Sequence, residues 1–326
     1  MEKIIIRSSL ALIALTVLSC KMIDEFCNKP PTASFTVSPT LGTIDTVFDF
    51  NANSNTNNQD ATTDLLVRWD WNNDGTYDTN YNTTKTATHR YTAQGTYTVK
   101  LEVKDSEGLT YTTTKTFTVY TGIVTDIDGN SYYTVQIGGQ LWMAENLKTT
   151  SYKNGEAIPN VTDKVQWSNI TTGSYCSYYN DESYVSMYGM LYNWLAVSDN
   201  RGLAPTSWHI PSDAEWKELE MYLGMSQSTA GKYSWRGTEE SSKLKSTNGW
   251  YENGNGTNEY GFSALPGGYR HINGSFVNMS SYATFWSSTE TNSNNAFYRS
   301  LSYYDGKVYR YDYNKHYGFC VRCIKD

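Results

Sequence analysis

The first third of this chain alternates apolar and polar side chains one by one, which is the pattern of a β-strand with one buried face. In one such run the apolar face consists of Tyr97, Val99, Leu101 and Val103. Shorter runs occupy residues 33–37, 48–50 and 111–120, and no helical period separates them. Residues 31–120 are therefore predicted to form an all-β, antiparallel sandwich.

The sequence from residue 122 onward contains tight-turn dipeptides between strand-forming residues. These are Asp128-Gly129, Asn273-Gly274 and Asp305-Gly306. Such dipeptides supply the positive φ angles that two-residue hairpins require. We expect hairpins to be the main structural unit of this half.

Two helices are predicted among these hairpins. The first is indicated by an N-cap at Ser186 and by the helical spacing of Met187, Leu191, Trp194 and Val197. The second opens with the capping box Ser212-Asp213-Ala214-Glu215 and ends at Gly224. Its buried face is predicted to contain Trp216, Leu219 and Leu223. The second half is therefore expected to be α+β.

The acidic composition of the chain makes one class of binding partner, the nucleic acids, improbable. The formal net charge is −7 and no basic stripe offsets it, which argues against a nucleic-acid partner. Aromatic residues make up 15% of the chain, and they combine a large contact area with a polar tip. This composition suits β-rich cores and binding surfaces.

The first twenty residues have the pattern of an export signal, because Lys3 and Arg7 flank an apolar run that is too short to span a bilayer stably. Residues Val17-Leu18-Ser19-Cys20 resemble a bacterial lipobox. That resemblance implies removal of residues 1–19 as a signal peptide and lipidation of Cys20. The alternative is a plain secretory signal with an unmodified cysteine.

A lipidated Cys20 would hold the protein at the bacterial outer membrane, since several acyl chains anchor a protein firmly where one does so only marginally. Residues 20–30 then form a tether. Asp24 and Glu25 resemble the acidic export tag of surface lipoproteins, which implies exposure on the cell surface. No other apolar stretch approaches the roughly 20 residues of a membrane helix, so the lipid is the expected membrane attachment.

Several short sequence motifs in the first half of the chain occur in the order that one known domain family shows. They are Trp69-Asp70-Trp71, Asp74-Gly75, His89-Arg90-Tyr91, Gly95-Thr96-Tyr97-Thr98-Val99 and Val103-Lys104-Asp105. These blocks resemble the PKD domain over residues 31–120. The resemblance implies an immunoglobulin-like sandwich that serves as a spacer or adhesive module on extracellular proteins. The family's usual aromatic-Gly-Asp-Gly turn is altered here.

The second half carries a longer series of blocks in order. They are Gln140-Leu141-Trp142-Met143-Ala144-Glu145-Asn146-Leu147, Tyr188-Gly189, Leu191-Tyr192-Asn193-Trp194, Trp208-His209-Ile210-Pro211-Ser212-Asp213-Ala214-Glu215-Trp216, Gly261-Phe262-Ser263-Ala264-Leu265-Pro266-Gly267-Gly268-Tyr269-Arg270, Trp286-Ser287-Ser288-Thr289-Glu290, Gly318-Phe319 and Val321-Arg322-Cys323. Together they resemble the Fibrobacter succinogenes major paralogous domain over residues 123–326.

Some of these blocks also resemble the formylglycine-generating enzyme group, which implies a C-type-lectin-like fold. Those enzymes need a close cysteine pair near the Gly-Gly block, and no cysteine lies between Gly268 and Phe319. The oxidase reaction is therefore not expected. The related family usually has a cysteine where Ala204 stands here, and its absence makes Cys176 the expected disulfide partner of Cys323.

One loop of the first half spaces oxygen ligands like the start of a calcium loop: Asp70, Asn72, Asp74 and Asp78. Tyr81 stands where the bidentate carboxylate of such a loop belongs. The favoured interpretation is a turn that uses Asp74-Gly75 for its backbone angles. No cofactor is expected, and calcium is the one candidate metal.

Two groups in the second half are candidate ligand-binding residues. Tyr309, Tyr311 and Tyr313 alternate with Arg310 and Asp312, so their rings either stack on sugars or pack on a neighbouring strand. A second group combines guanidinium, indole and carboxylate: Arg270, Trp286, Glu290 and Arg299. These either line a polar pocket or form a buried ion pair.

The resulting hypothesis is a non-enzymatic, lipid-anchored surface protein in which the PKD-like sandwich presents a lectin-like domain to a glycan or protein ligand. No convergent acid and base indicate an enzyme. The alternatives are an extracellular enzyme acting on polysaccharide or protein, and an architectural component of the surface layer.

Overall fold

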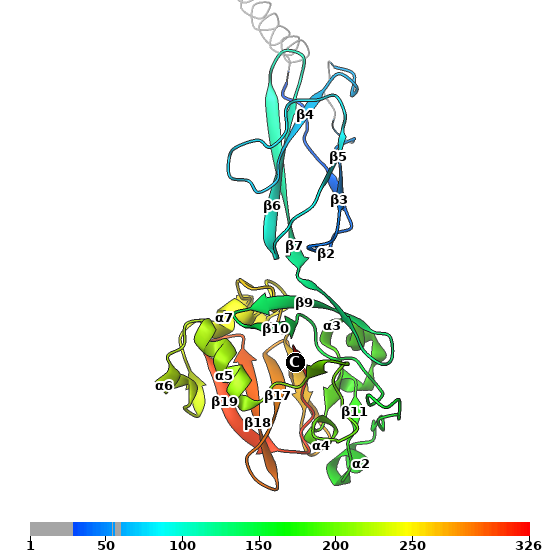
Figure 1. Cartoon of the computed structure of the whole chain (residues 1–326), viewed down its shortest axis with the longest axis vertical. Helices are drawn as coiled ribbons and strands as arrows, with labels where there is room; N and C mark the ends of the chain where they lie inside the picture. Colours follow the sequence, from blue (N-terminus) through cyan, green and yellow to red (C-terminus); the bar gives the residue numbers. More distant parts are fainter. Residues whose placement is uncertain (1–28, 54, 56–59) are drawn as a thin grey trace, which may run out of the picture. The chain divides into compact units, whose positions relative to one another are not determined.

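The computed structural model describes residues 29–53, 55 and 60–326 (Figure 1). The chain divides into two compact units, one formed mainly by residues before Thr118 and the other mainly by residues 118–326. The predicted signal peptide and the predicted lipid attachment at Cys20 lie outside the described residues. Within the described part, no helix has both the length and the apolar composition that crossing a membrane requires.

The chain up to Tyr120 forms two sheets. One has the order β1-β3-β5, with strands β1 (Thr36–Ser38), β3 (Phe48–Asn51) and β5 (Thr86–His89). The other has the order β2-β7-β6-β4, with strands β2 (Gly42–Thr43), β7 (Thr110–Tyr120), β6 (Gly95–Lys104) and β4 (Leu66–Asp70). Strand β2 pairs with β7 in parallel, and β4 pairs with β6 antiparallel.

The buried residues of the first unit follow the predicted alternation. Val99, Leu101 and Val103 of β6 are fully buried. They face a core of aromatic rings in which Trp69 and Trp71 stack with their centroids 5.3 Å apart. Burial of these rings together with the aliphatic residues gives the unit its hydrophobic core. The β-sandwich predicted for this region is confirmed.

The second unit is built on three sheets, in the orders β13-β20-β10-β9-β8, β14-β19-β18-β17-β15-β16 and β11-β12. Their strands are β8 (Gly122–Thr125), β9 (Ser131–Ile137), β10 (Gln140–Met143), β11 (Tyr175–Cys176), β12 (Leu191–Tyr192), β13 (Trp208–His209), β14 (Ser234–Arg236), β15 (Gly267–Arg270), β16 (Phe276–Met279), β17 (Tyr282–Glu290), β18 (Asn295–Ser302), β19 (Val308–Asn314) and β20 (Ile324–Lys325).

Short helices connect these strands. The α-helices are α2 (Lys164–Asn169), α3 (Val185–Tyr188), α4 (Trp194–Val197), α5 (Asp213–Tyr222), α6 (Gln227–Ala230) and α7 (Glu240–Leu244). The 3₁₀ turns are η1 (Tyr178–Asn180), η2 (Glu182–Tyr184) and η3 (Tyr251–Asn253).

All three predicted hairpins form. Gly129 and Gly274 have φ angles of 85° and 80°, as their turns require. The third hairpin joins β18 to β19, but Gly306 is not among the residues with positive φ. A Cβ at Gly306 would lie 2.5 Å from the carbonyl oxygen of Thr238, so close backbone approach explains this glycine.

The two predicted helices have different outcomes. The capping box of α5 is present, and Trp216 and Leu219 are buried as predicted. The continuous helix predicted through residues 187–197 is wrong, because the segment forms α3, β12 and α4 in turn. Gly189, at φ 71°, ends α3. The Asn193 side chain accepts a hydrogen bond from Ala196 N and begins α4 anew.

The predicted disulfide between Cys176 and Cys323 is not formed. Cys176, Cys320 and Cys323 are free and buried. Cys176 packs in the core cluster around Trp142, whereas Cys323 packs in a second cluster around Trp286. Burial raises the pKa of the Cys176 thiol to about 11 and that of Cys320 to about 12, so both thiols are protonated at neutral pH.

A buried ionic cluster fastens helix α5 to one face of the six-stranded sheet (Figure 1). The helix contributes two carboxylates, and the strands β14, β18 and β19 contribute one arginine each. We call this set the α5 ionic cluster; it consists of Asp213, Glu220, Arg236, Arg299 and Arg310. All five side chains are nearly inaccessible to solvent.

The contacts in the α5 ionic cluster are short and directional. Arg310 Nε and Nη2 each lie 2.7 Å from an oxygen of Asp213, which is a bidentate pair. Arg299 Nε lies 2.6 Å from Glu220 Oε1. Burial alone would raise the pKa of Asp213, but the hydrogen bonds from Arg310 and the charge of Arg299 hold it well below its usual range.

Two further buried arginines bind carbonyl oxygens instead of carboxylates. Arg270 donates to Thr162 O at 3.0 Å and stacks on Trp167. Arg322 donates to Ser263 O at 3.1 Å and to Asn146 Oδ1 at 2.8 Å. Burial lowers the pKa of Arg322 to about 9. These guanidinium groups satisfy loop carbonyls that would otherwise be buried without a partner.

Replacing Glu220 with glutamine tests the α5 ionic cluster. The substitution keeps the shape but leaves Arg236 and Arg299 without their shared carboxylate, so we expect a loss of about 3–5 kcal/mol in the free energy of unfolding. Urea unfolding followed by tryptophan fluorescence measures it. Lys217→Gln is the control: Lys217 lies 3.1 Å from Asp213 but is partly exposed, so about 0–1 kcal/mol is expected. Equal losses in the two variants would show that the Glu220 carboxylate does not stabilise the fold more than a surface ion pair does.

Candidate functional site

The six-stranded sheet presents two chemically different faces. Arg299 pairs with Arg310 across β18 and β19, and both side chains point to α5. Their strand neighbours Ser300 and Tyr309 also pair, and because successive residues alternate they point to the opposite face. The same alternation places Trp235 of β14 beside Tyr309. The face away from α5 is therefore rich in aromatic rings.

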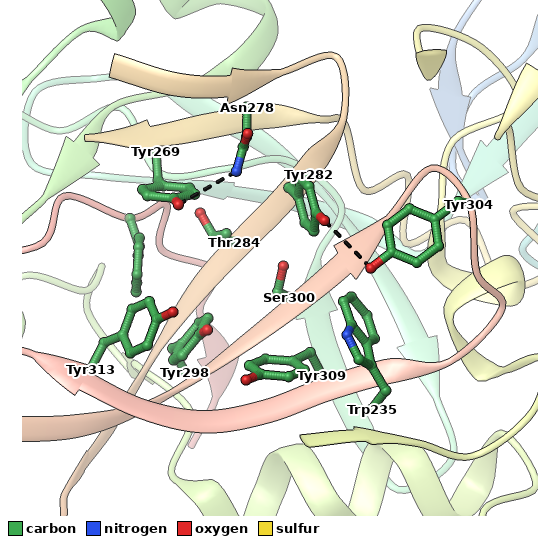
Figure 2. Close-up of a pocket in the computed structure, with 11 residues that line it drawn as sticks. Trp235, Tyr269, Asn278, Tyr282, Thr284, Tyr298, Ser300, Tyr304, Tyr309 and Tyr313 are labelled. Carbon is green, nitrogen blue, oxygen red and sulfur yellow. Dashed lines mark hydrogen bonds between the residues drawn. The ribbon is translucent and has the colours of Figure 1, made fainter. Parts of the chain in front are cut away.

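This aromatic face encloses a cavity of about 220 Å³ (Figure 2). Eleven residues from all six strands of the sheet and the adjoining loops line it: Trp235, Tyr269, Asn278, Tyr282, Thr284, Tyr298, Ser300, Tyr304, Tyr309, Tyr313 and Phe319. The floor is well buried at Thr284, Tyr298 and Ser300. Figure 2 shows Tyr313, Tyr298, Tyr309 and Trp235 following one another along the cavity.

The polar groups in the cavity are hydroxyl and amide groups. Thr284 Oγ1 donates to Gly268 O at 2.9 Å, which fixes that side chain on the floor. Asn278 Nδ2 lies 3.4 Å from the hydroxyl of Tyr269, and the hydroxyls of Tyr282 and Tyr304 lie 3.5 Å apart. These long contacts leave the groups with capacity for stronger hydrogen bonds to a ligand.

The cavity carries no formal charge at neutral pH. None of its lining residues is an aspartate, glutamate, lysine, arginine or histidine. Burial raises the pKa of Tyr298, and that of Tyr282 is raised by burial together with a hydrogen bond to Tyr304. These phenols therefore remain protonated. The arrangement can stack flat rings and exchange neutral hydrogen bonds, and it offers no acid–base pair.

The predicted tyrosine row is only partly in the site. Tyr309 lines the cavity, and its ring centroid lies 4.9 Å from that of Trp235. Tyr311 lies outside the lining, is 40% exposed and packs edge-to-face on Tyr233. Tyr313 of the same row also lines the cavity. The rings pack on their neighbours, as the second interpretation predicts, and stacking on sugars stays a prediction.

The predicted polar pocket of Arg270, Trp286, Glu290 and Arg299 is not formed. Trp286 pairs with Tyr298 whereas Arg299 pairs with Phe285, so Trp286 and Arg299 point to opposite faces of the sheet. Arg270 is enclosed by loop carbonyls, and Trp286 is buried against Phe319. Glu290 is exposed and pairs with Lys315 at 2.8 Å. The alternative of a buried ion pair holds for Arg299, in the α5 ionic cluster.

Most of the cavity was not identified from the sequence. Trp235, Tyr269, Tyr282, Tyr298 and Tyr304 come from separate strands and turns, and only the pairing register brings them together. A usable signal was present in Tyr298 and Ser300, which alternate with Arg299 in a strand-like run. Alternation of tyrosine with arginine marks a strand whose two faces meet different surroundings.

The candidate calcium residues form a hydrogen-bonded turn. The carboxylate of Asp70 accepts from the backbone N–H groups of Asp74 and Gly75, and Asp78 accepts from Trp71 N at 2.7 Å. Asn72 donates to Asp74. Tyr81 donates its hydroxyl to Glu102. Among the described residues, no group of three acidic, histidine or cysteine side chains is arranged to hold a metal ion.

We predict that calcium leaves the thermal unfolding of the full chain unchanged, because backbone amides already occupy the oxygens of this loop. Scanning calorimetry with millimolar CaCl₂ and with a chelator measures it, and MgCl₂ controls for ionic strength. A melting temperature that rises only with calcium and falls back with the chelator would contradict the turn interpretation.

Comparison with known proteins identifies two families that match parts of this chain. The profile described as Fibrobacter succinogenes major domain matches residues 135–325, and the profile of the PKD domain matches residues 28–120. None of the curated proteins matches the chain.

Three solved structures resemble parts of the chain. One, titled "Structural basis for the promiscuous specificity of the carbohydrate-binding modules from the beta-sandwich super family", is 34% identical and has a TM-score of 0.27. The match covers 31% of this chain and 38% of that one. The PKD1 domain of Vibrio anguillarum Epp is 26% identical over 29% of this chain and 99% of its own, with a TM-score of 0.24. The PKD1 domain of the Vibrio cholerae metalloprotease PrtV is 22% identical, with a TM-score of 0.22. That match covers 28% of this chain and 98% of the PrtV domain.

The profile matches are consistent with the two units of the fold, since one lies in the sandwich region and the other in the hairpin-rich region. The first profile covers more than half of the chain. The chain therefore belongs to the Fibrobacter succinogenes major domain family and carries a PKD domain ahead of the family region.

Proposed function

We propose that this protein is a non-enzymatic binding protein whose C-terminal domain holds a neutral sugar ring in the tyrosine-lined cavity. The observation that carries the proposal is the lining itself, in which aromatic rings alternate with hydroxyl and amide groups and no side chain is charged. A pyranose offers C–H faces to aromatic rings and hydroxyls to neutral donors and acceptors. Convergent polar groups in an apolar, concave site are the usual means of fixing such a ligand.

The proposal of binding without turnover follows from where the carboxylates lie. Glycoside hydrolysis uses two carboxyl groups that flank the scissile bond. Asp213 and Glu220 point into the opposite face of the sheet, where arginines neutralise them. The cavity lining supplies neither a proton donor with a suitable pKa nor a nucleophile activated by a base.

We further propose that the protein is lipid-anchored at Cys20 in the outer membrane and that the PKD domain is a spacer. The sequence of residues 1–20 and the match to a PKD domain support this arrangement. We also propose a C-type-lectin-like fold for the C-terminal domain. Its hairpin-rich sheets and flanking helices support that assignment.

A glycan array with wild-type protein, followed by calorimetry with the sugars it selects, tests the binding function. We expect Tyr309→Ala to weaken binding about tenfold, because it removes a ring in contact with both Trp235 and Tyr298. Tyr222→Ala is the matched control, since Tyr222 is exposed on α5. A blank array with folded wild-type protein would refute the function.

Replacing Cys20 with serine tests the anchor. Without a thiol no acyl chain can be attached there, so we expect the variant to keep residues 1–19 and to be absent from the outer-membrane fraction. Fractionation and mass spectrometry of the mature N-terminus measure both effects. A variant that still reaches the outer membrane with its first 19 residues removed would argue against lipidation at Cys20.

A further inference from the structure

We propose that the cavity is one subsite of a longer site and that the ligand is a linear, neutral oligosaccharide of several units. This inference rests on the proposed sugar-binding function. One unit occupies the cavity, and the following units lie on a row of rings, two exposed and the middle one half-buried, that continues from its open end. We call this row the outer aromatic strip; it consists of Tyr304, Tyr303 and Tyr251.

The dimensions of the aromatic face exceed those of one sugar. The enclosed volume of about 220 Å³ is below the roughly 300 Å³ at which sites for drug-sized ligands begin, so it accommodates one ring. Tyr309 and Tyr313 are four residues apart on β19, which at ~3.3 Å per residue separates them by about 13 Å. Rings are therefore arrayed over more length than a single pyranose can cover.

The outer aromatic strip is continuous with the cavity. Tyr304 lines the cavity beside Trp235, with centroids 5.9 Å apart (Figure 2). Tyr303 lies 5.3 Å from Tyr304, and Tyr251 lies 5.3 Å from Tyr303. These contacts are edge-to-face, which leaves ring faces uncovered for a ligand. Tyr304 is 55% exposed and Tyr251 is 52% exposed.

Backbone contacts hold the strip in place. Tyr303 N donates to Ser281 O at 3.0 Å, and Tyr251 N donates to Ser280 O at 2.8 Å. Both tyrosines are thus fastened to the same turn between β16 and β17. A Cβ at Gly254 would lie 2.1 Å from Tyr303 O, so this glycine lets the η3 turn approach the strip closely. Rings that are ordered before binding lose little conformational entropy when a ligand arrives.

Charge beside the strip favours an uncharged ligand. Glu252 follows Tyr251 in the η3 turn, and its hydrogen bond raises the pKa of the Tyr251 hydroxyl. The exposed glutamate places a negative charge at the outer end of the strip. Sulfated or uronic-acid sugars would be repelled there, whereas neutral units would not.

Calorimetry with ladders of β-1,4-linked glucose, xylose and mannose, one to six units long, tests the inference. For at least one ladder we expect affinity to rise tenfold or more between one unit and the longest chain. The ratio of these two affinities should fall about fivefold in Tyr304→Ala and in Tyr251→Ala. Tyr251→Phe, which keeps the ring, should retain the ratio, and Tyr222→Ala should change nothing. Circular dichroism confirms that each variant is folded.

The outcomes separate this inference from the proposed function. Binding that does not increase beyond one unit, or that is confined to branched glycans on the array, overturns the extended site and leaves sugar binding intact. A length-dependent gain that both alanine variants retain also overturns it, because another surface would then hold the outer units. Absence of binding to every ladder and to the array overturns both.

Discussion

The structure of the C-terminal domain depends on the engagement of two α5 carboxylates by three arginines from neighbouring strands. Because burial of an unpaired charge is so unfavourable, the helix has one position in which Asp213 and Glu220 both find guanidinium partners. That position fixes which face of β14, β18 and β19 the helix covers. A hydrophobic contact alone would tolerate sliding of the helix, whereas a bidentate ion pair does not.

Strand geometry converts this constraint into a sheet with two chemically different faces. Once Arg299 and Arg310 point to α5, their neighbours Tyr298 and Tyr309 must point away, because successive side chains of a strand alternate. Charge therefore gathers on one side of the sheet and aromatic rings on the other. The cavity is neutral for this reason, and a neutral ligand loses no hydration of a charge on entering it.

Local patterns in the sequence predicted much of the fold. The alternating strands of the first unit, the three hairpins and the capping box of α5 depend on neighbouring residues, and the structure contains them. The helix predicted through residues 187–197 failed because its apolar spacing suits a helix while Gly189 and Asn193 interrupt the backbone. The pairing of Cys176 with Cys323 failed because no local pattern reports which core cluster a cysteine joins.

The candidate site was harder to predict because its residues are distant in the sequence and only the pairing of the strands brings them together. Tyr309 was identified from alternation within its own strand, but Tyr298 and Trp235 join it through cross-strand pairing. The arginines that were wrongly assigned to a ligand pocket also depend on contacts between distant segments. Arg270 and Arg299 are the residue types of a polar ligand site, yet both are enclosed by partners within the protein.

The blocks that carry the family resemblance and the residues that line the cavity are largely different sets. Arg270 and Arg322 lie in those blocks and bind loop carbonyls, so they maintain the scaffold. Of the cavity residues, only Tyr269 and Phe319 fall within the blocks. In this chain the residues of the family resemblance therefore include ones that hold the loops in place. In the proposed function, the ligand contacts tyrosines and a tryptophan that lie on the strands of this sheet and mostly outside those blocks.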